Sequence, residues 1–376
     1  MKARANHALA AAGAVAAMVC GYAAPAAAAG PAAQGLSTVQ PGQSIQAAID
    51  AVRPGATIVV AAGVHHENLL VTKPLTLKGA DGAVLLPAPT ITPNICTLDP
   101  DAPEGNNVGI CVLGALGPVP EGEDVPPVVA PVKNVAIENF EIAGFTSGIV
   151  TLGTRNLRVE GVEIDGGGAG IFTEDGDHTV LAGNTVHDNT GPGFNVRGST
   201  GIRLTGNTAE ANVGEGMLVL NSHGGSITGN TLAGNCAGLT VVDTAEPGFA
   251  GDLRIAANVV RANNLYCAGD DEGRPSESGI GIGLLGTSRV LVERNAITGN
   301  VGAADPESGQ PAFFGGAGLV LIDGALAGGG APADNRVAHN IIRDNQPLDV
   351  LTDGSGSGNV FSVNDCVVAN LAGICD

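Results

Sequence analysis

Five residues in the middle of the chain are of the types that perform acid–base chemistry on sugars. Glu174 and Arg197 lie 23 residues apart, and His178, His187 and Asp188 are close to them in sequence. A carboxylate, an imidazole and a guanidinium on one surface can transfer protons and hold a negatively charged group. These five are candidate catalytic residues, provided that the fold brings them together. The alternative to a catalytic role is that Glu174 and Arg197 form an exposed ion pair worth about 0–1 kcal/mol. In that case the histidines are only exposed residues of turns.

A second group of candidates is acidic and would bind a metal ion. Asp243 lies in one polar segment, and Asp270, Asp271 and Glu272 lie in another. Carboxylate oxygens are the ligands that calcium prefers, but the D-x-D-x-D-G spacing of a calcium loop is absent. Solvated surface charge is therefore the competing interpretation. We expect no cofactor, with calcium as the alternative.

A repeated heptad indicates how these residues are positioned. GNTVHDN, GNTAEAN and GNTLAGN are followed by the looser copies ANVVRAN, RNAITGN and HNIIRDN. The two asparagines keep the spacing N-x4-N in all six copies, while the step between copies grows from 23 to 45 residues. A unit this short cannot bury its own apolar face, so the units must stack on one another.

Short runs of β-forming residues lie between the heptads: GIVTL, GIFTE, GFNVR, GMLVL, GLTVV and GLVLI. Their period-two alternation predicts strands. Coils of about 22 or 23 residues with three strands each predict an all-β fold, a parallel β-helix solenoid, with strands ~4.8 Å apart. Asparagines and glycines would take the left-handed conformation at sharp bends, and stacked asparagines would form ladders. We assign none of these asparagines to catalysis, and expect Asn221, outside the heptads, to tolerate substitution.

One β-helix domain is predicted over residues 44–376. Residues 1–29 combine Lys2, Arg4, an apolar run and small residues before Gly30, which is typical of a secretory signal peptide, and residues 30–43 form a lead. Ser44 is expected to begin an N-terminal capping helix over the first coil. The predicted insertions are a long one, 87–133, and loops 243–252, 267–279, 303–315 and 324–334.

Six cysteines remain after the predicted signal peptide, and an even number in an exported protein favours disulfides. Local pairing is preferred because each pair then brackets a single loop. The predicted pairs are Cys96–Cys111, Cys236–Cys267 and Cys366–Cys375. Zinc is disfavoured because no CxxC motif occurs.

The formal net charge of −20 excludes nucleic acid and anionic membranes as good partners. An acidic polysaccharide would need bridging calcium or a local basic pocket on such a surface. No segment is long and apolar enough to span a membrane. We expect a secreted, extracellular monomer whose partner is a polysaccharide or a cell-surface glycan.

The outward positions of the later strands predict a ligand groove. Its apolar floor would consist of Leu218, Leu220, Thr240, Val242, Val320 and Ile322. Loops at opposite edges would wall this floor, with Glu174 and Arg197 at its mouth. If the loops close instead, the floor becomes a second small core.

Part of the sequence resembles a known class of proteins. SIQAAIDAVRPGATIVVAAGVHHENLLVTKPLTLKGADG is similar to the opening of secreted pectate-lyase-like right-handed β-helix proteins. CAGDDEGRPSESGIGIGL and GSGSGNVFSVNDC resemble bacterial β-helix repeat proteins with no assigned activity. The resemblance, over roughly residues 38–376, implies the fold but not the chemistry, because β-helices host enzymes and adhesins alike.

The catalytic motifs of related enzyme families are missing or fragmentary. Alginate epimerases carry Asp-Pro-His, for example, whereas Asp177-His178 lacks the proline. We therefore expect polysaccharide binding or processing outside the cell, by a lyase, hydrolase or epimerase if the protein is an enzyme. The alternative is a non-catalytic structural or surface-interaction protein.

Overall fold

The computed structural model describes residues 35–97, 106–120, 126–244, 246, 248–269 and 275–375. The predicted signal peptide lies outside the described residues. Ala33–Asp376 form one compact unit. In the described residues, no helix has the length and apolar character needed to cross a membrane.

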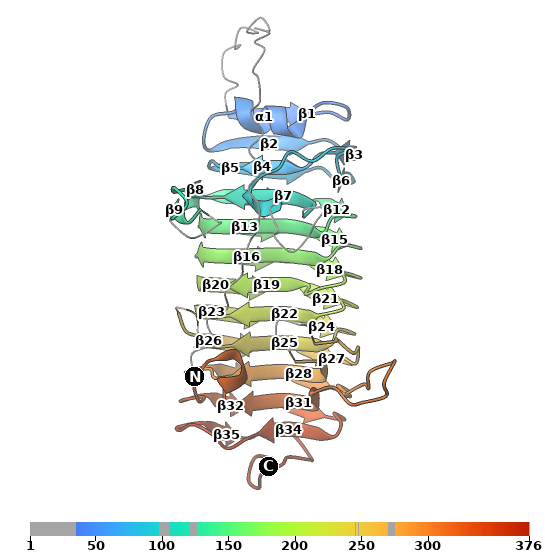
Figure 1. Cartoon of the computed structure of the whole chain (residues 1–376), viewed down its shortest axis with the longest axis vertical. Helices are drawn as coiled ribbons and strands as arrows, with labels where there is room; N and C mark the ends of the chain where they lie inside the picture. Colours follow the sequence, from blue (N-terminus) through green and yellow to red (C-terminus); the bar gives the residue numbers. More distant parts are fainter. Residues whose placement is uncertain are drawn as a thin grey trace, which may run out of the picture. The chain divides into compact units, whose positions relative to one another are not determined.

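Three stacks of parallel strands build this unit, and we name them after β16 (Ala169–Asp177), β17 (Val180–Ala182) and β18 (Thr185–His187). Strands of successive coils pair in parallel, as where Ile171 lies opposite Phe194 and Val186 opposite Ala209. Figure 1 shows the strands following one another in chain order along the unit. This arrangement confirms the predicted parallel β-helix.

The β16 stack contains β4 (Leu69–Val71), β7 (Val108–Leu113), β13 (Ser147–Arg155), β16, β19 (Phe194–Arg197), β22 (Glu215–Leu220), β25 (Ala237–Val242), β28 (Glu277–Leu285), β31 (Phe314–Ile322) and β34 (Leu348–Thr352). The β17 stack contains β1 (Leu36–Val39), β2 (Ala56–Val60), β5 (Leu75–Gly79), β11 (Val135–Glu138), β14 (Arg158–Glu160), β17, β20 (Thr200–Thr205), β23 (His223–Thr228), β26 (Gly251–Ala256), β29 (Leu291–Glu293), β32 (Arg336–Ala338) and β35 (Val360–Ser362). The β18 stack contains β3 (Gly63–His66), β6 (Ala83–Leu86), β12 (Glu141–Ala143), β15 (Glu163–Asp165), β18, β21 (Thr208–Glu210), β24 (Thr231–Ala233), β27 (Val259–Arg261), β30 (Ala296–Thr298) and β33 (Ile341–Arg343).

A few elements are not full members of these stacks. The helix α1 (Ile45–Ala51) begins where the sequence predicts one, because Ser44 Oγ accepts a hydrogen bond from the Ala47 N–H at 3.0 Å. Its apolar residues Ile45 and Ile49 are buried, and it contacts β1, β2 and β4. The strands β8 (Ala115–Leu116) and β9 (Val128–Ala130) pair antiparallel with each other. The short strand β10 (Val132–Lys133) pairs in parallel with the end of β13. The remaining elements are η1 (Ile95–Thr97) and η2 (Ala325–Ala327).

Two predicted boundaries differ from the structure. β1 lies in the predicted lead and pairs with β2, so the sheet begins before residue 44. The predicted insertion 87–133 is interrupted by β7, which rejoins the β16 stack between β4 and β13. The apolar residues VGICVL of β7 are all buried, which explains why this segment returns to the stack.

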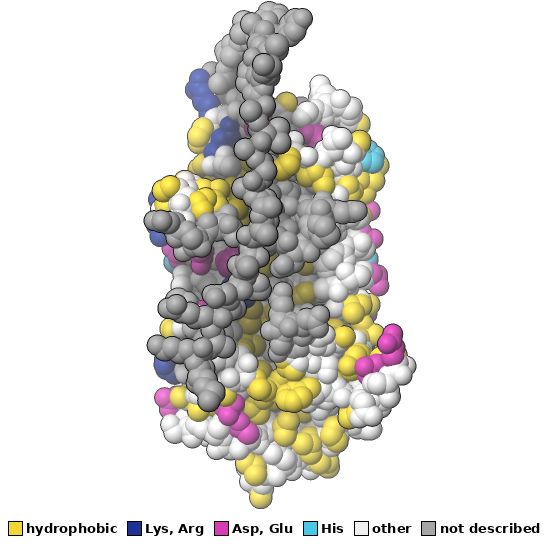
Figure 2. Space-filling view, in the orientation of Figure 1, with side chains coloured by type: hydrophobic (Ala, Val, Ile, Leu, Met, Phe, Trp, Pro, Cys, Tyr) yellow, Lys and Arg dark blue, Asp and Glu magenta, His cyan; other side chains and the backbone are white. Residues whose placement is uncertain are grey.

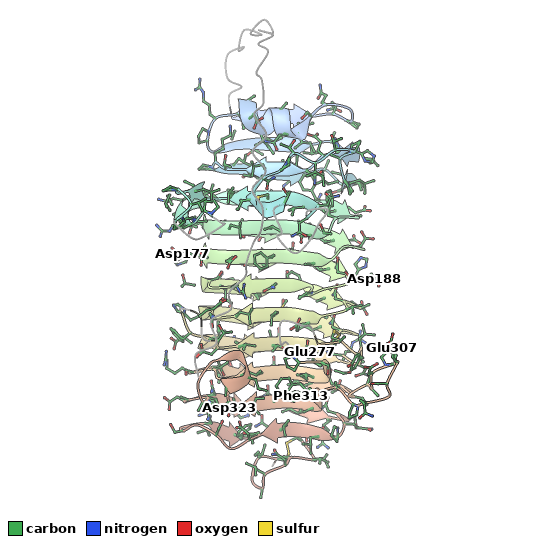
Figure 3. The ribbon with its side chains drawn as sticks, viewed as in Figure 1. Asp177, Asp188, Glu277, Glu307, Phe313 and Asp323 are labelled. Carbon is green, nitrogen blue, oxygen red and sulfur yellow. A yellow bond between two sulfur atoms is a disulfide. The ribbon has the colours of Figure 1, made fainter. Side chains whose placement is uncertain are left out.

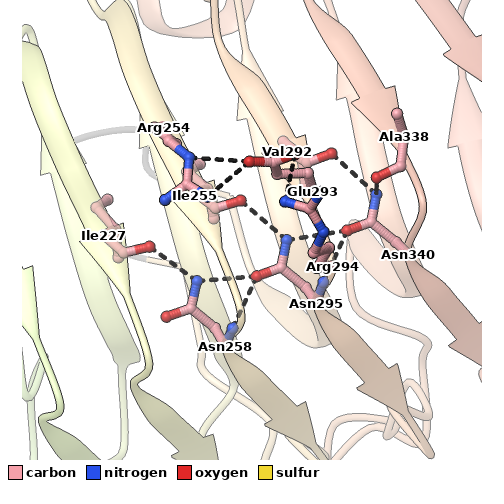
Figure 4. Close-up of polar contacts among 10 residues, drawn as sticks. All are labelled: Ile227, Arg254, Ile255, Asn258, Val292, Glu293, Arg294, Asn295, Ala338 and Asn340. Atoms are coloured by element: carbon pink, nitrogen blue, oxygen red, sulfur yellow. Dashed lines mark hydrogen bonds and ion pairs between the residues drawn. The ribbon is translucent and has the colours of Figure 1, made fainter.

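The heptad asparagines form the predicted ladders. Asn207 donates from Nδ2 to Asn230 Oδ1 at 3.0 Å, and its own Oδ1 accepts from Asn184 Nδ2 at 3.0 Å. Figure 4 shows the same pattern for Asn258, Asn295 and Asn340. These side chains are buried, so each amide bonded in this way avoids the cost of an unsatisfied polar group.

The second asparagine of each heptad forms a second ladder, which runs from Asn189 to Asn345 and ends on a carboxylate. Asn345 Nδ2 donates to Asp349 Oδ1, and Asp349 Oδ2 accepts from the backbone N–H groups of Val367 and Val368. An acceptor-only group suits this position because every donor in the ladder points toward it.

The expected left-handed conformation is confirmed for the heptad glycines but not for the heptad asparagines. The backbone φ is positive at the residue before each heptad asparagine, such as Gly183, Gly206 and Ala257, and not at the asparagine itself. The asparagine is therefore selected for its side-chain hydrogen bonds and its neighbour for the bend.

The predicted disulfides Cys96–Cys111, Cys236–Cys267 and Cys366–Cys375 form. Such bonds persist in oxidising compartments and are rare in the cytosol. They therefore favour an extracytoplasmic location.

Candidate functional site

Two rows of side chains project outward from the β16 stack, because alternate residues of a strand point to opposite faces. Across five successive strands the rows are Val150, Phe172, Asn195, Leu218 and Thr240, and Leu152, Glu174, Arg197, Leu220 and Val242. Most of these residues are apolar. Glu174, Asn195 and Arg197 interrupt them, and we call these three the central polar group.

Apolar clusters flank the central polar group along the stack. The cluster on the N-terminal side contains Cys96, Val108, Cys111, Leu113 and Val150. The cluster on the C-terminal side contains Ala237, Ile280, Ala317 and Val320. Charged groups between two apolar clusters lose part of their hydration, which strengthens their mutual electrostatic interactions.

Glu174 is the residue most affected by this environment. It lies in register with Arg197 on the neighbouring strand. Burial raises the pKa of the Glu174 carboxyl, the guanidinium of Arg197 opposes this rise, and the charges of Asp175 and Glu246 add to it. The net shift is upward, so this carboxyl takes up a proton more readily than an exposed glutamate.

Arg197 retains hydrogen-bonding capacity toward a ligand. Its Nε lies 3.8 Å from Glu246 Oε2, too far for a good hydrogen bond. Among the described residues, neither Arg197 Nε nor Asn195 Oδ1 has a hydrogen-bond partner, although both atoms are buried. The group therefore offers one unused donor and one unused acceptor beside Glu174.

His178 lies apart from the central polar group. Its Nδ1 is 2.5 Å from Asp177 Oδ1, and Arg155 Nε donates to Asp177 Oδ2 at 2.8 Å. Partial burial raises the pKa of Asp177, but the hydrogen bonds from His178 and Arg155 outweigh this and hold the pKa below its usual range. This cluster therefore has the contacts of a surface ion pair.

His187 and Asp188 form a third cluster. His187 Nδ1 lies 2.8 Å from Asp188 Oδ2, and its Nε2 lies 3.3 Å from Glu163. The hydrogen bond to Asp188 raises the pKa of His187, partial burial opposes the rise, and Glu163 adds to it. Figure 3 shows Asp177 and Asp188 at opposite edges of the molecule. Of the five candidate catalytic residues, the structure therefore places Glu174 beside Arg197 and His187 beside Asp188, in two separate places, and leaves His178 apart from both pairs.

The predicted groove residues lie in two places. Leu218, Leu220, Thr240 and Val242 line a cavity of about 300 Å³. Val320 and Ile322 lie further along the stack in the C-terminal apolar cluster, packed with Ile280, Ala317 and Phe314. Part of the predicted floor is thus a small second core, and part remains a cavity.

Loops from both edges approach this surface. Figure 3 places Glu307, of the loop before β31, and Asp323, directly after β31, on opposite edges. The loops after β25 and after β31 also contact each other. Thr244, in the loop after β25, forms an antiparallel backbone bridge with Gly328, in the loop after β31.

The proposed calcium ligands Asp270, Asp271 and Glu272 lie outside the described residues. Burial raises the pKa of the Asp243 carboxyl, and a hydrogen bond from the backbone of Ala250 opposes this rise. The described part of the chain contains no group of three or more His, Cys, Asp or Glu residues that could hold a metal ion.

Glu215 is a site residue that sequence reasoning missed. It lines the cavity and is only 4% exposed. A signal was present, because equivalent positions of other coils carry Pro192, Ala237, Ile280 and Ala317. A lone carboxylate among small or apolar residues marks a position with a special environment. The contact between Glu246 and Arg197 was also missed, since it depends on the path of the loop after β25.

Residues 128–253 match a family model described as a right handed beta helix region. Among solved structures, the A-module of mannuronan C-5 epimerase AlgE4 from Azotobacter vinelandii is similar over 90% of this chain and 93% of its own, with 17% identity and a TM-score of 0.57. The family 28 exopolygalacturonase of Yersinia enterocolitica is similar over 90% of this chain and 79% of its own, with 13% identity and a TM-score of 0.55. A mutant of the periplasmic alginate epimerase AlgG is similar over 87% and 83% of the two chains, with 14% identity and a TM-score of 0.52.

No curated protein matches this chain in sequence. At these identities the similar structures show the fold alone, and this chain is a right-handed β-helix protein. Its chemistry must be argued from its own residues.

Proposed function

We propose that this protein is an exported β-helix protein that binds and processes an acidic polysaccharide at the central polar group. The observation that carries the proposal is the register pairing of Glu174, whose carboxyl has a raised pKa, with Arg197, whose Nε makes no hydrogen bond among the described residues. The names of similar structures refer to mannuronan, alginate and polygalacturonase, which supports a uronate polymer as the substrate class.

The two residues would have different tasks. A guanidinium binds carboxylates in a planar, charge-assisted geometry, so Arg197 would hold a uronate carboxylate on an otherwise acidic protein. Glu174 would exchange a proton with the same sugar ring, because burial raises the pKa of its carboxyl and so makes its protonated form, the general acid, more available than in an exposed glutamate. This division of tasks fits a lyase, an epimerase or a hydrolase.

A panel of pectins, alginate, xylans and glycosaminoglycans tests this proposal. Formation of reducing ends, unsaturated uronide absorbance and epimerisation by NMR would be followed with and without calcium. Glu174→Gln is expected to lower the rate by about 10²–10⁴-fold, whereas Arg197→Lys should mainly raise KM. The matched control is Glu293→Gln, a partly buried carboxylate on the β17 stack that pairs with Arg254 and Arg294 and lies outside the central polar group. Equal rates for Glu174→Gln and the parent would contradict the assignment.

A second candidate function is that of a non-catalytic structural or surface-interaction protein. The C-terminal apolar cluster favours it, because the outward side chains of β31 there pack as a small core. Binding to a glycan of the panel without any product would support this second candidate.

The remaining expectations concern the whole chain. We propose cleavage after Ala29, export to the extracellular space, a monomeric state and a capping role for α1. Mass spectrometry of the protein collected from the culture medium tests the cleavage site, and sedimentation tests the monomer. Loss of cooperative melting in Ile49→Asp would support the capping role, because Ile49 is on the buried face of α1.

A further inference from the structure

The cavity of about 300 Å³ next to the central polar group has its own chemical character. Its walls are mainly apolar and include Leu218, Leu220, Val242, Leu285, Phe314 and Leu326. Glu215, Thr244 and Glu277 also line it. Leu220 lies in register with Arg197, so the cavity begins one strand from the central polar group. Figure 2 shows hydrophobic side chains gathered on this face over the C-terminal strands. The volume, roughly that of ten water molecules, is at the lower end of the range for ligand sites.

A buried hydroxyl lines this apolar cavity. Thr240 is 5% exposed, and its Oγ1 has no hydrogen-bond partner among the described residues. A buried hydroxyl without a partner is costly, and native proteins rarely leave one unsatisfied. A ligand oxygen in the cavity would satisfy it.

The space beside Thr240 results from a glycine. Gly283 lies in register with Thr240 on the next strand. A Cβ added at Gly283 would lie 3.4 Å from Leu285 Cδ1 and 3.5 Å from Thr240 Cγ2, which are ordinary contact distances. A methyl group at this position would therefore fit without strain, and its absence leaves the space open.

We propose that this cavity binds the acyl group of an esterified carbohydrate, with the ester carbonyl accepting a hydrogen bond from the Thr240 hydroxyl. A charged group would lose its hydration against the leucine, valine and phenylalanine walls, and the carboxylates of Glu215 and Glu277, which also line the cavity, disfavour an anion, so the occupant is neutral. One oxygen on an otherwise apolar body matches the Thr240 hydroxyl, which has no hydrogen-bond partner among the described residues. The carbohydrate part of this proposal rests on the proposed function, because it places a sugar ring at the central polar group beside the cavity.

Calorimetric titration with sucrose monooctanoate, below its micelle concentration, tests the proposal. Sucrose and sodium octanoate are the comparison ligands. The ester is expected to bind, sucrose is not, and octanoate should bind at least tenfold more weakly than the ester, since it brings a charge.

Three variants locate the binding site. Thr240→Val removes the hydroxyl at constant shape and should weaken binding about threefold to tenfold. Gly283→Val should abolish binding by occupying the space. Leu326→Asp adds a charge to a wall residue that is 66% exposed, so it weakens binding without disturbing the fold. Gly330→Ala is the control, since a Cβ there meets nothing within 4 Å.

The outcomes separate this proposal from the proposed function. Binding of the ester that is lost in Gly283→Val and Leu326→Asp but kept in Gly330→Ala supports the cavity, even if the glycan panel yields no product. Absent binding, or binding unaffected by all three cavity variants, overturns the cavity even if the panel succeeds. Octanoate binding as tightly as the ester overturns the carbohydrate ester as the ligand.

Discussion

Glu174 couples the chemistry of the site to the stability of the fold. Its pKa is raised in the folded protein, chiefly by burial. The folded state therefore holds a proton over a pH range in which the unfolded state has already lost it. Stability must then decrease as the pH rises from the ordinary carboxyl pKa through the raised value. An ionised Glu174 is a cost to folding at neutral pH.

The first prediction follows from this sign. Glu174→Gln should melt at a higher temperature than the parent at neutral pH, and the difference should vanish below the ordinary carboxyl pKa. Thermal melts between pH 3 and pH 8 measure this, roughly spanning the range in which carboxyls titrate. Glu210→Gln, on the exposed side of β21, controls for the loss of one negative charge. A difference that stays constant with pH would mean that the burial of Glu174 is not the cause.

At the scale of structural elements, the asparagine ladders give the next prediction, and a substitution of Asn207 tests one of them. Asn207→Leu leaves the Asn184 amide and the Leu181 carbonyl without their partners. Because both groups are buried, the free energy of unfolding should fall by about 1–3 kcal/mol. Chemical denaturation measures the change. Glu210→Leu, in the same coil and exposed, should stay within about 0.5 kcal/mol of the parent, and equal losses in both variants would contradict the ladder.

The bends make a second prediction at this scale. Ala257 is exposed and has φ of 56°, a conformation that costs a residue with a Cβ about 1–2 kcal/mol. Glycine relieves this cost but gains entropy in the unfolded state, so Ala257→Gly should stabilise by about 0.5–1 kcal/mol. The same change at Ala51, in α1, should destabilise by about 1 kcal/mol. Urea denaturation of both variants measures the change in the free energy of unfolding. Changes of opposite sign at Ala257 and Ala51 would support the left-handed conformation of Ala257.

The sequence predicts elements better than it predicts their bends. The strands and the ladder partners follow from spacing alone, because both repeat with the coil. Asn221 shows the limit, since the expectation that it tolerates substitution is wrong. It is 2% exposed, has φ of 45°, and exchanges hydrogen bonds with Thr244 of the next coil. The bend recurs at Asp175, Gly198 and Asn221, but the residue type changes from coil to coil, so the heptads do not identify it.

At the scale of the molecule, topology decides which candidate residues meet. Glu174 and Arg197 occupy equivalent positions of one stack, and their 23-residue spacing predicts the pairing. His178 follows the turn out of β16, and His187 ends β18, so each faces a different side of the coil. Nearness in sequence is a poor guide here, because a coil turns through three faces in about 22 or 23 residues. The cavity depends on loops whose lengths and sequences do not repeat from coil to coil, so the repeat spacing does not predict it.

Net charge gives the last prediction. The chain carries a formal charge of −20, so an acidic glycan is repelled at long range although Arg197 attracts it at contact. Salt screens the long-range part first, since the Debye length falls from about 30 Å at 0.01 M to about 8 Å at 0.15 M. Association with an acidic glycan should therefore become severalfold faster as salt is added over this range, the reverse of ordinary electrostatic steering. Stopped-flow association rates measure this, with neutral dextran as the ligand that should show no dependence. Arg197→Ala should keep the acceleration and lose affinity at every salt concentration. Slower association at higher salt would mean that local positive charge, and not the whole surface, governs the approach.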